Sequence, residues 1–276
     1  MNTPSTNFST DLSADSPRPL LHSRDARGVH TLTLNQPATF NALSEDMLAA
    51  LQAAVDAVAL DKVARVVVIA AQGKAFCAGH NLKDLRAQPE PAYYQKLFAQ
   101  CTRVMLGLQN LPVPVIAKVQ GLATAAGCQL VAQCDLAVAA EHASFGVNGI
   151  DVGLFCATPS VPLVRNMPAK QAMEMLLTGE FITAEEARLR GLVNRVVAAD
   201  ALDAALEQLV QTLLLKPAVA IAMGKALFYK QRETGIEAAY QLAGQAMACN
   251  LSHPVAQEGL QAFIDKRKPQ WPALEA

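Results

Sequence analysis

Short apolar runs, each followed by a loop of small residues and a helical segment, recur along this chain and constrain its fold most strongly. Residues 65–71, 115–119 and 135–139 are such runs, rich in Val, Ile and Ala. Runs of this length and composition are typical of buried strands. Strand, loop and helix repeated in series predict a mostly parallel sheet with covering helices. The sequence therefore predicts an α/β protein.

Capping signals and helix breakers mark the elements around these runs. Ser44 is a good N-cap, followed by Glu45 and Asp46 at the positive end of a helix dipole. Thr183 and the Glu three residues later match a capping box. The pattern at 201–266 is helical almost throughout, with breaks at Pro217 and at the His253–Pro254 turn.

The length of 276 residues and an apolar content of 52% indicate a chain that buries a substantial core. We expect three regions: a disordered leader at 1–19, an α/β core at 20–199 and a helical region at 200–276. The leader has no apolar stretch typical of a secretory signal, and its acidic residues disfavour a transit peptide. The sequence thus predicts a cytoplasmic protein.

Charge and cysteine content exclude several classes of partner. The formal net charge is −1, which argues against electrostatic binding to nucleic acid and against a polybasic membrane anchor. No stretch of about 18 apolar residues appears. The six cysteines are expected to be reduced, buried and small apolar residues, and the scattered histidines predict no metal site. We expect a small molecule or another protein subunit as partner, and no permanently bound cofactor.

Two small-residue loops, at 76–83 and 121–129, are the candidates for chemistry. Each leaves a predicted strand and enters a helix, where unpaired N–H groups can hold an anion or a developing oxyanion. Gly and Ala also let a ligand approach the backbone closely. Two such loops side by side would offer two donors to one ester or thioester oxygen. The alternative is that both loops only pack.

Other catalytic loops are absent from the sequence. It contains no G-x-x-x-x-G-K-[ST] phosphate loop, no G-x-G-x-x-G dinucleotide loop and no G-x-S-x-G nucleophile elbow. Cys77, His80 and Asp84 are too close in sequence to surround one substrate atom as a thiol hydrolase requires.

Several motifs occur in a fixed order along the chain: Asn35-Gln-Pro, Asn41-Ala-Leu, Phe76-Cys-Ala-Gly-His-Asn-Leu, Pro114-Val-Ile-Ala-Lys-Val-Gln-Gly, Leu130-Val-Ala-Gln-Cys-Asp and Phe145-Gly. From about residue 29 to 271 the chain resembles the crotonase superfamily, the enoyl-CoA hydratases and isomerases. The resemblance implies a spiral of ββα units with a C-terminal helical trimerisation region. It also implies a CoA-thioester ligand and assembly as a trimer or a dimer of trimers.

The same resemblance implies contacts to CoA. Ala78 and Leu82 would line the adenine pocket, and Lys83 would lie near the CoA phosphates. Phe263 and Lys266 match positions that reach CoA from the C-terminal helix, commonly across a subunit boundary.

In the resemblance the oxyanion donors are the backbone amides of His80 and Ala126, and the two glutamates of hydration fall at Gln129 and Gly149. Gln exchanges no proton near neutral pH, and Gly has no side chain. A positioned acid or base contributes about 10²–10⁴-fold to a rate, so ordinary hydration is not expected. Asp151 is a weak candidate for a replacement base, because an extended stretch would put it on the same face as residue 149.

Two functions remain open. The first is an acyl-CoA enzyme of the lyase or isomerase class, which stabilises an enolate or a tetrahedral oxyanion with two amides. The second is a non-catalytic acyl-CoA binding or regulatory oligomer. Gln129 is expected to hold water or thioester by hydrogen bonds, and Cys156 to form part of the pocket wall, with a nucleophilic role as its alternative. Asp135 matches a family position that is structural.

Overall fold

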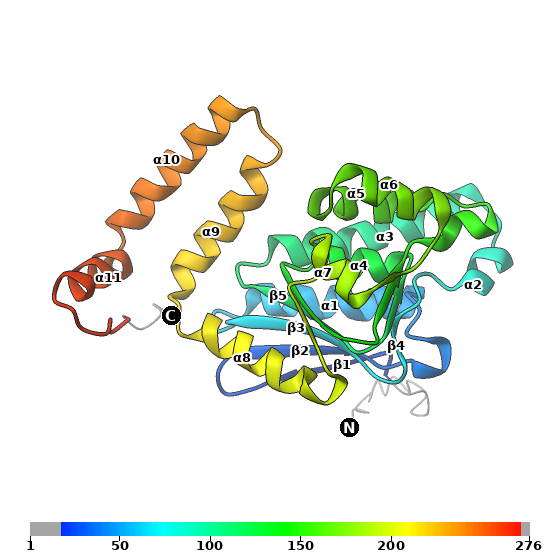
Figure 1. Cartoon of the computed structure of the whole chain (residues 1–276), viewed down its shortest axis with the longest axis horizontal. Helices are drawn as coiled ribbons and strands as arrows, with labels where there is room; N and C mark the ends of the chain where they lie inside the picture. Colours follow the sequence, from blue (N-terminus) through cyan, green and yellow to red (C-terminus); the bar gives the residue numbers. More distant parts are fainter. Residues whose placement is uncertain (1–17, 272–276) are drawn as a thin grey trace, which may run out of the picture.

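The computed structural model describes residues 18–271, which form two β-sheets surrounded by helices (Figure 1). The larger sheet has the strand order β1 (Leu20–Arg24), β2 (Val29–Leu34), β3 (Val66–Ala71), β5 (Val115–Val119), β7 (Leu136–Ala140) and β10 (Arg195–Val197). Strand β1 is antiparallel to β2, and the remaining neighbours are parallel. The predicted α/β class and the mostly parallel sheet are confirmed.

The smaller sheet is made of very short strands. Its order is β4 (Ala75–Cys77), β6 (Leu122–Thr124), β8 (Ser144–Gly146) and β9 (Ile182–Thr183). Strands β4, β6 and β8 directly follow β3, β5 and β7, and a helix comes next each time, which gives the spiral of ββα units implied by the resemblance. The prediction that the segments of β4 and β6 are entirely loop was wrong, because three residues are too few to show a strand period.

Both faces of the larger sheet are covered. Val67 and Ile69 on β3 point into the main core, beneath helices α1 (Glu45–Leu60) and α3 (Pro91–Asn110). Val66 and Val68 point to the other face, against α8 (Leu202–Leu214). A strand buried on both sides needs apolar residues at every position, which explains its unbroken apolar sequence.

Caps set the helix boundaries where the sequence predicted them. The Ser44 side chain accepts a hydrogen bond from the Met47 backbone N–H at 3.3 Å. Thr183 and Glu186 form the reciprocal capping box at the start of α7. The other helices of the spiral are α2 (Leu82–Ala87), α4 (Ala126–Gln133), α5 (Ala157–Asn166), α6 (Ala169–Thr178) and α7 (Ala184–Leu189), with 3-10 turns at Pro37–Thr39, Asn148–Val152 and Ala199–Ala201.

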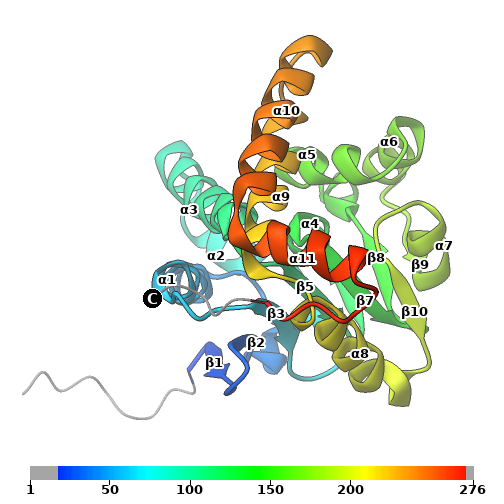
Figure 2. The ribbon, with the colours of Figure 1, turned by 90° about the vertical axis from the view of Figure 1, so that its left-hand side faces the viewer.

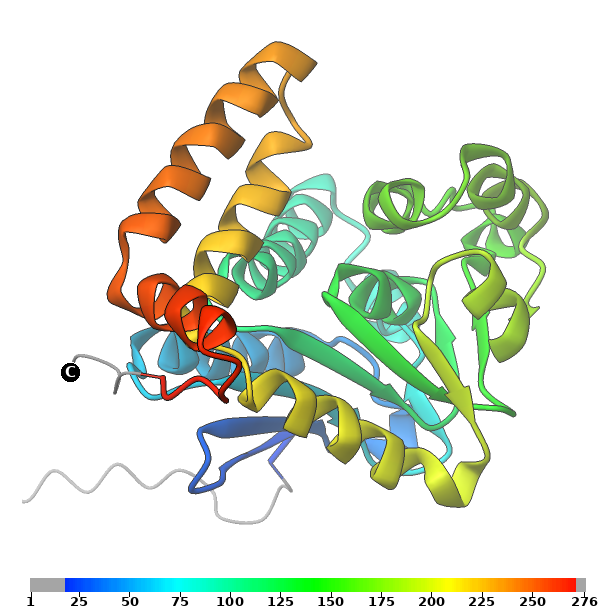
Figure 3. The ribbon, with the colours of Figure 1, turned by 60° about the vertical axis from the view of Figure 1, so that its left-hand side comes forward.

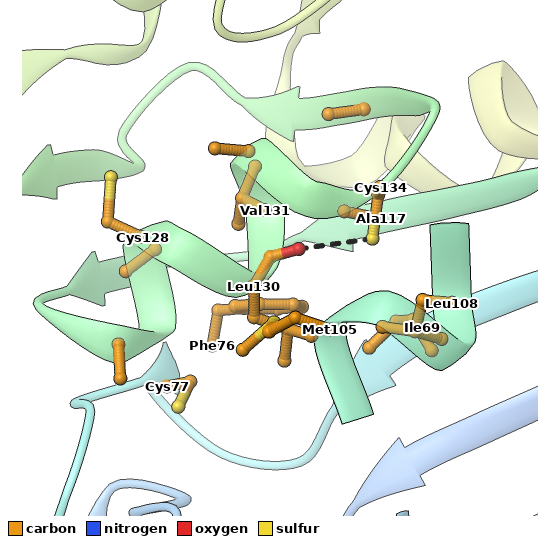
Figure 4. Close-up of a cluster of buried hydrophobic side chains, with 14 of the residues drawn as sticks. Ile69, Phe76, Cys77, Met105, Leu108, Ala117, Cys128, Leu130, Val131 and Cys134 are labelled. Carbon is orange, nitrogen blue, oxygen red and sulfur yellow. Dashed lines mark hydrogen bonds between the residues drawn. The ribbon is translucent and has the colours of Figure 1, made fainter. Parts of the chain in front are cut away.

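Helix α4 is buried at the centre of the main core. Its Leu130 packs near Phe76 and Met105, and the Cys134 thiol donates to the Leu130 carbonyl at 3.2 Å (Figure 4). Burial on all sides fixes the start of this helix, which forms one edge of the candidate site. Five of the six cysteines are buried as expected, but the expectation was wrong for Cys249, which is exposed on α10.

The C-terminal helices are present as predicted. Helices α9 (Ala218–Gln231) and α10 (Ile236–Ser252) form an antiparallel pair that stands off the spiral, and α11 (Pro254–Ile264) folds back toward its base (Figures 2 and 3). The break between α9 and α10 was not predicted. Within residues 18–271 no single helix is long and apolar enough to cross a membrane; Ala199–Leu214 and Ala218–Gln231 satisfy that test only as a pair, bent by 102°.

A partly buried ion pair attaches α9 to the spiral. Lys225 Nζ donates to Asp135 Oδ2 at 2.6 Å, and the Tyr229 hydroxyl donates to Asp135 Oδ1 at 2.7 Å. The Val115 backbone N–H also donates to Asp135 Oδ2, at 2.7 Å. Burial lowers the pKa of Lys225 and raises that of Tyr229. Asp135 therefore joins α9 to the beginning of β5, in agreement with its expected structural role.

Candidate functional site

An apolar cavity of about 310 Å³ lies beside the start of α4. Its wall comes from three segments, 78–85, 124–126 and 148–159, together with Phe98 from α3. Among the described residues, the wall carries no carboxylate, ammonium or guanidinium group. A ligand that enters would therefore be oriented by a few neutral polar groups.

The first loop of the wall is held from outside. The Ala78 backbone N–H donates to the Phe40 carbonyl at 3.0 Å, and the Leu43 N–H donates to the Gly79 carbonyl at 2.8 Å. The His80 ring also bonds the Leu43 carbonyl, at 3.1 Å from Nδ1. These bonds use the outward groups of the loop and leave the His80 backbone amide uninvolved.

Asn41 explains why the outer segment is so well placed. Its side chain is fully buried and accepts from the Gln36 backbone N–H at 2.9 Å. Its amide donates to the carbonyls of Gln72 and Ala75 at 2.8 and 2.9 Å. Asn41 thereby ties the segment before α1 to strand β4. The sequence motif Asn41-Ala-Leu pointed to the family but not to this role.

The two small-residue loops meet at Gly79. It has φ +82°, and a Cβ there would lie 2.9 Å from the Ala125 Cβ and 3.0 Å from the Ala126 backbone nitrogen. Such contacts and such a φ restrict this position to glycine. The loops are consequently in direct contact, as a shared site requires.

Ala125 turns the chain into α4 through an uncommon conformation. Its φ is 50° and its ψ −120°, and its N–H donates to the Gly146 carbonyl at 2.9 Å. A non-glycine residue in such a region costs about 1–3 kcal/mol, a strain often found at functional sites. Ala126 is the first residue of α4, where helical N–H groups lack intrahelical partners. Within residues 18–271 neither the Ala126 nor the His80 backbone N–H donates a hydrogen bond.

The two positions where the resemblance expects glutamates, 129 and 149, differ in whether they line the cavity. Gly149 is part of the cavity wall. Gln129 is buried on α4 with 4% exposure, lies outside the wall, and has an Oε1 atom without a hydrogen-bond partner. The extended backbone on which the role of Asp151 depended is not found, because Asn148–Val152 form a 3-10 helix. Asp151 is exposed, its carboxylate faces Gly179, and it does not line the cavity.

Two titratable side chains of the wall are kept neutral. Burial lowers the pKa of His80, whose Nε2 atom is buried without a partner. Burial also raises the pKa of the Cys156 thiol. Since the thiolate is the nucleophilic form, this environment disfavours the alternative role for Cys156. Neutral groups and backbone amides are thus what the cavity offers to a ligand.

The residues expected to bind CoA are only partly brought together within one chain. Ala78 and Leu82 line the cavity, and Lys83 is exposed on α2 just beside them. Phe263 on α11 is 85% exposed, and Lys266 follows it. Helices α2 and α11 lie at opposite ends of the molecule (Figure 1). The contribution of these two residues across a subunit boundary stays a prediction.

Acid is expected to destabilise the protein through His80. Because burial lowers its folded-state pKa, the unfolded chain binds the proton more readily, so stability falls as the pH drops through about 6.5, the unfolded value. Thermal unfolding at pH 7.5 and 5.5 should show a larger loss for the wild type than for His80→Asn. Parallel losses in both proteins would contradict this assignment.

Repeated ββα units, helices at the C-terminus and a cavity bounded by two contacting small-residue loops describe a protein of the crotonase type. The family model "Enoyl-CoA hydratase/isomerase" matches residues 24–273. The chain belongs to the enoyl-CoA hydratase/isomerase family, within the crotonase superfamily.

Comparison with individual proteins shows which members of the family this chain resembles. "Enoyl-CoA hydratase domain-containing protein 3, mitochondrial" of Xenopus laevis is 44% identical over 253 residues, 92% of this chain and 86% of the relative. The crystal structure of the human protein of that name has a TM-score of 0.88 at 44% identity, with 92% and 100% of the two chains covered. An enoyl-CoA hydratase structure from Mycobacterium smegmatis has a TM-score of 0.91 at 61% identity, with 93% and 99% covered.

These relatives correct the predicted location. The domain-containing protein 3 relatives from frog, mouse, rat, human and zebrafish are all named as mitochondrial. The prediction of a cytoplasmic protein was therefore wrong. It depended on the composition of residues 1–19, of which 1–17 lie outside the described residues.

Proposed function

We propose that this protein binds acyl-CoA thioesters and polarises the thioester carbonyl with the backbone N–H groups of His80 and Ala126. One observation carries the proposal: the two loops touch at Gly79, beside the cavity, and both amides are without acceptors in the described residues. Preorganised donors of this kind are worth most in a water-excluded site, because they need no reorganisation when negative charge develops on oxygen.

The proposed chemistry ends at the polarised carbonyl unless a proton acceptor is supplied. Two donors stabilise an enolate or a tetrahedral oxyanion, and loss of one such donor typically costs about 10²–10³-fold in rate. Two-glutamate hydration is not part of the proposal, since residue 129 is Gln and residue 149 is Gly. Lys83 is proposed to meet the CoA phosphates.

A second candidate, a non-catalytic acyl-CoA binding or regulatory oligomer, is supported by the neutral wall of the cavity. The described wall has no carboxylate that could act as an acid or base, so a ligand could bind there without being converted. Exposed apolar side chains on the C-terminal helices, among them Ile236, Tyr240, Met247 and Phe263, support self-association. We propose a trimer or a dimer of trimers, in which Phe263 and Lys266 reach the CoA bound by a neighbouring subunit.

Crotonyl-CoA tests the proposal. We expect it to bind, with its carbonyl stretching frequency lowered in the infrared and its enoyl absorbance retained, because the carbonyl is polarised but water is not activated. A ¹³C label at the thioester carbon identifies the band. Rapid loss of the enoyl absorbance would refute the interpretation that residues 129 and 149 supply no acid or base for hydration.

A variant at the start of α4 tests the donor itself. Ala126→Pro removes one N–H at the first helical position, where proline is common, but it also restricts the backbone of Ala125, so circular dichroism first has to show that the variant folds. It should diminish the infrared shift, whereas Ala126→Gly, which retains the N–H, should preserve it. An unchanged shift in a folded Ala126→Pro protein would exclude that amide as a donor. Turnover of any malonyl, 3-hydroxyacyl or unsaturated thioester would favour the enzyme over the binder.

A further inference from the structure

Thr124 and Asn148 are two of the neutral polar side chains of the largely apolar cavity wall, which also carries His80, Cys156 and Thr158. Thr124 ends β6, and Asn148 follows β8 by two residues. The two strands are parallel neighbours in which Thr124 is opposite Gly146. Strand pairing therefore brings the two side chains together, and the Thr124 hydroxyl donates to Asn148 Oδ1 at 2.7 Å.

This hydrogen bond orients the Asn148 amide. With Oδ1 held by Thr124, the NH₂ group is turned away from it, and within residues 18–271 the Thr124 hydroxyl is the hydrogen-bond partner of this side chain. An asparagine amide carries two N–H donors. A half-buried donor in an apolar wall is the type of group that fixes the orientation of a ligand.

The position of Asn148 sets which part of a ligand it would meet. Its hydrogen-bond partner Thr124 is two residues from Ala126, and two residues span at most about 7 Å. If the Ala126 amide holds the thioester carbonyl, the Asn148 amide is placed near the next carbons of the acyl chain. A carboxylate at that point would lack a cation in the described wall, and burying an unpaired charge is costly.

We propose that Asn148 recognises a neutral oxygen on the third carbon of the acyl group, so that the preferred ligands are 3-oxoacyl or 3-hydroxyacyl thioesters of CoA. Asn148 is the contact residue, and Thr124 is the positioning residue that orients its amide. This inference rests on the proposed function, because it requires the acyl group to occupy the cavity.

Calorimetric binding of three CoA thioesters with four-carbon acyl groups tests the inference. The wild type should bind 3-oxobutyryl-CoA and 3-hydroxybutyryl-CoA about 3- to 10-fold more tightly than butyryl-CoA, the range given by one net hydrogen bond. Asn148→Ala should abolish the preference, so that the three thioesters bind with equal affinity. Thr124→Val, which removes the donating hydroxyl, should reduce the preference, whereas Thr124→Ser, which keeps the hydroxyl, should retain it. A merely structural role of Thr124 would not produce this difference.

The outcomes separate the two proposals. Failure of the wild type to bind any of the three thioesters would overturn the proposed function. Equal binding of all three, or a preference that survives Asn148→Ala, would overturn the inference and leave the proposed function intact. Tighter binding of malonyl-CoA than of 3-oxobutyryl-CoA would overturn the assignment of a neutral oxygen. If Asn148→Ala unfolds, the Thr124→Val and Thr124→Ser pair decides alone.

Discussion

The double variant Gln129→Glu/Gly149→Glu should fail to hydrate crotonyl-CoA, although it supplies glutamate at both positions where the resemblance expects one. A Cβ at residue 149 would lie 2.4 Å from the Leu154 carbonyl oxygen and 2.8 Å from Cys156 Sγ. The first contact is with backbone, and the Leu154 N–H itself donates to the Gly149 carbonyl at 2.9 Å. The turn therefore cannot open without breaking its own hydrogen bond.

Single substitutions of glycine measure the steric cost of a side chain at residue 149 separately from any effect on hydration. Gly149→Ala should cost about 1–3 kcal/mol of stability, the usual range for overpacking. Gly244→Ala, inside α10, is the matched control, because Gly244 is exposed with open space around its Cβ position, and it should not destabilise the protein, since Ala favours a helix. Hydration by the double variant should stay within about tenfold of wild type, whereas one positioned carboxylate would contribute about 10²–10⁴-fold. A hydration rate more than about tenfold above that of the wild type, in a folded double variant, would contradict the crowding argument.

Asp135→Ala should cause the largest loss of stability among single side-chain changes proposed here. It leaves the Lys225 ammonium, with a side-chain exposure of 8%, without its carboxylate. Removing one partner of a buried pair costs about 3–5 kcal/mol. The loss here should fall near the lower end of that range, because the pair is partly buried and Lys225 keeps the carbonyls of Leu108 and Val113 as acceptors. Urea unfolding at fixed pH and protein concentration measures the loss, and detachment of α9 should accompany it.

An exposed ion pair in the same protein is the control. Lys118 and Asp203 are 2.8 Å apart, and the Asp203 side chain is 83% exposed. Asp203→Ala should cost less than about 1 kcal/mol, as surface pairs usually do. Equal losses for the two aspartate variants would show that Asp135 contributes no more than a surface charge. Tyr229→Phe, which removes one hydrogen bond, should cost about 1 kcal/mol.

The sequence was sufficient for elements that carry their own signals. Strands 66–71 and 115–119 have enough apolar residues to be predicted. Ser44 and Thr183 are N-cap residues that predict the starts of their helices. Strands β4, β6 and β8 could not be predicted, because three residues show no period and their stability comes from pairing with one another. The paired sheet became visible only in the fold.

The site was predictable to the same extent. Both loops were identified from their small residues, but their contact at Gly79 depends on how the units of the spiral stack. Thr124 and Asn148 were missed, since isolated neutral side chains 24 residues apart show no pattern in sequence. The idea that Asp151 shares a face with residue 149 failed because it assumed extended backbone in a segment that is a 3-10 turn.

The unengaged amides of His80 and Ala126 have an evolutionary consequence. Every residue except proline contributes a main-chain N–H, so nearly any codon change at these two positions preserves the donor. Side-chain acids have no such protection and can disappear in one step. Under the proposed function, a lineage can accordingly lose a side-chain acid while the two main-chain donors to a carbonyl oxygen persist, and selection can then test new groups around them.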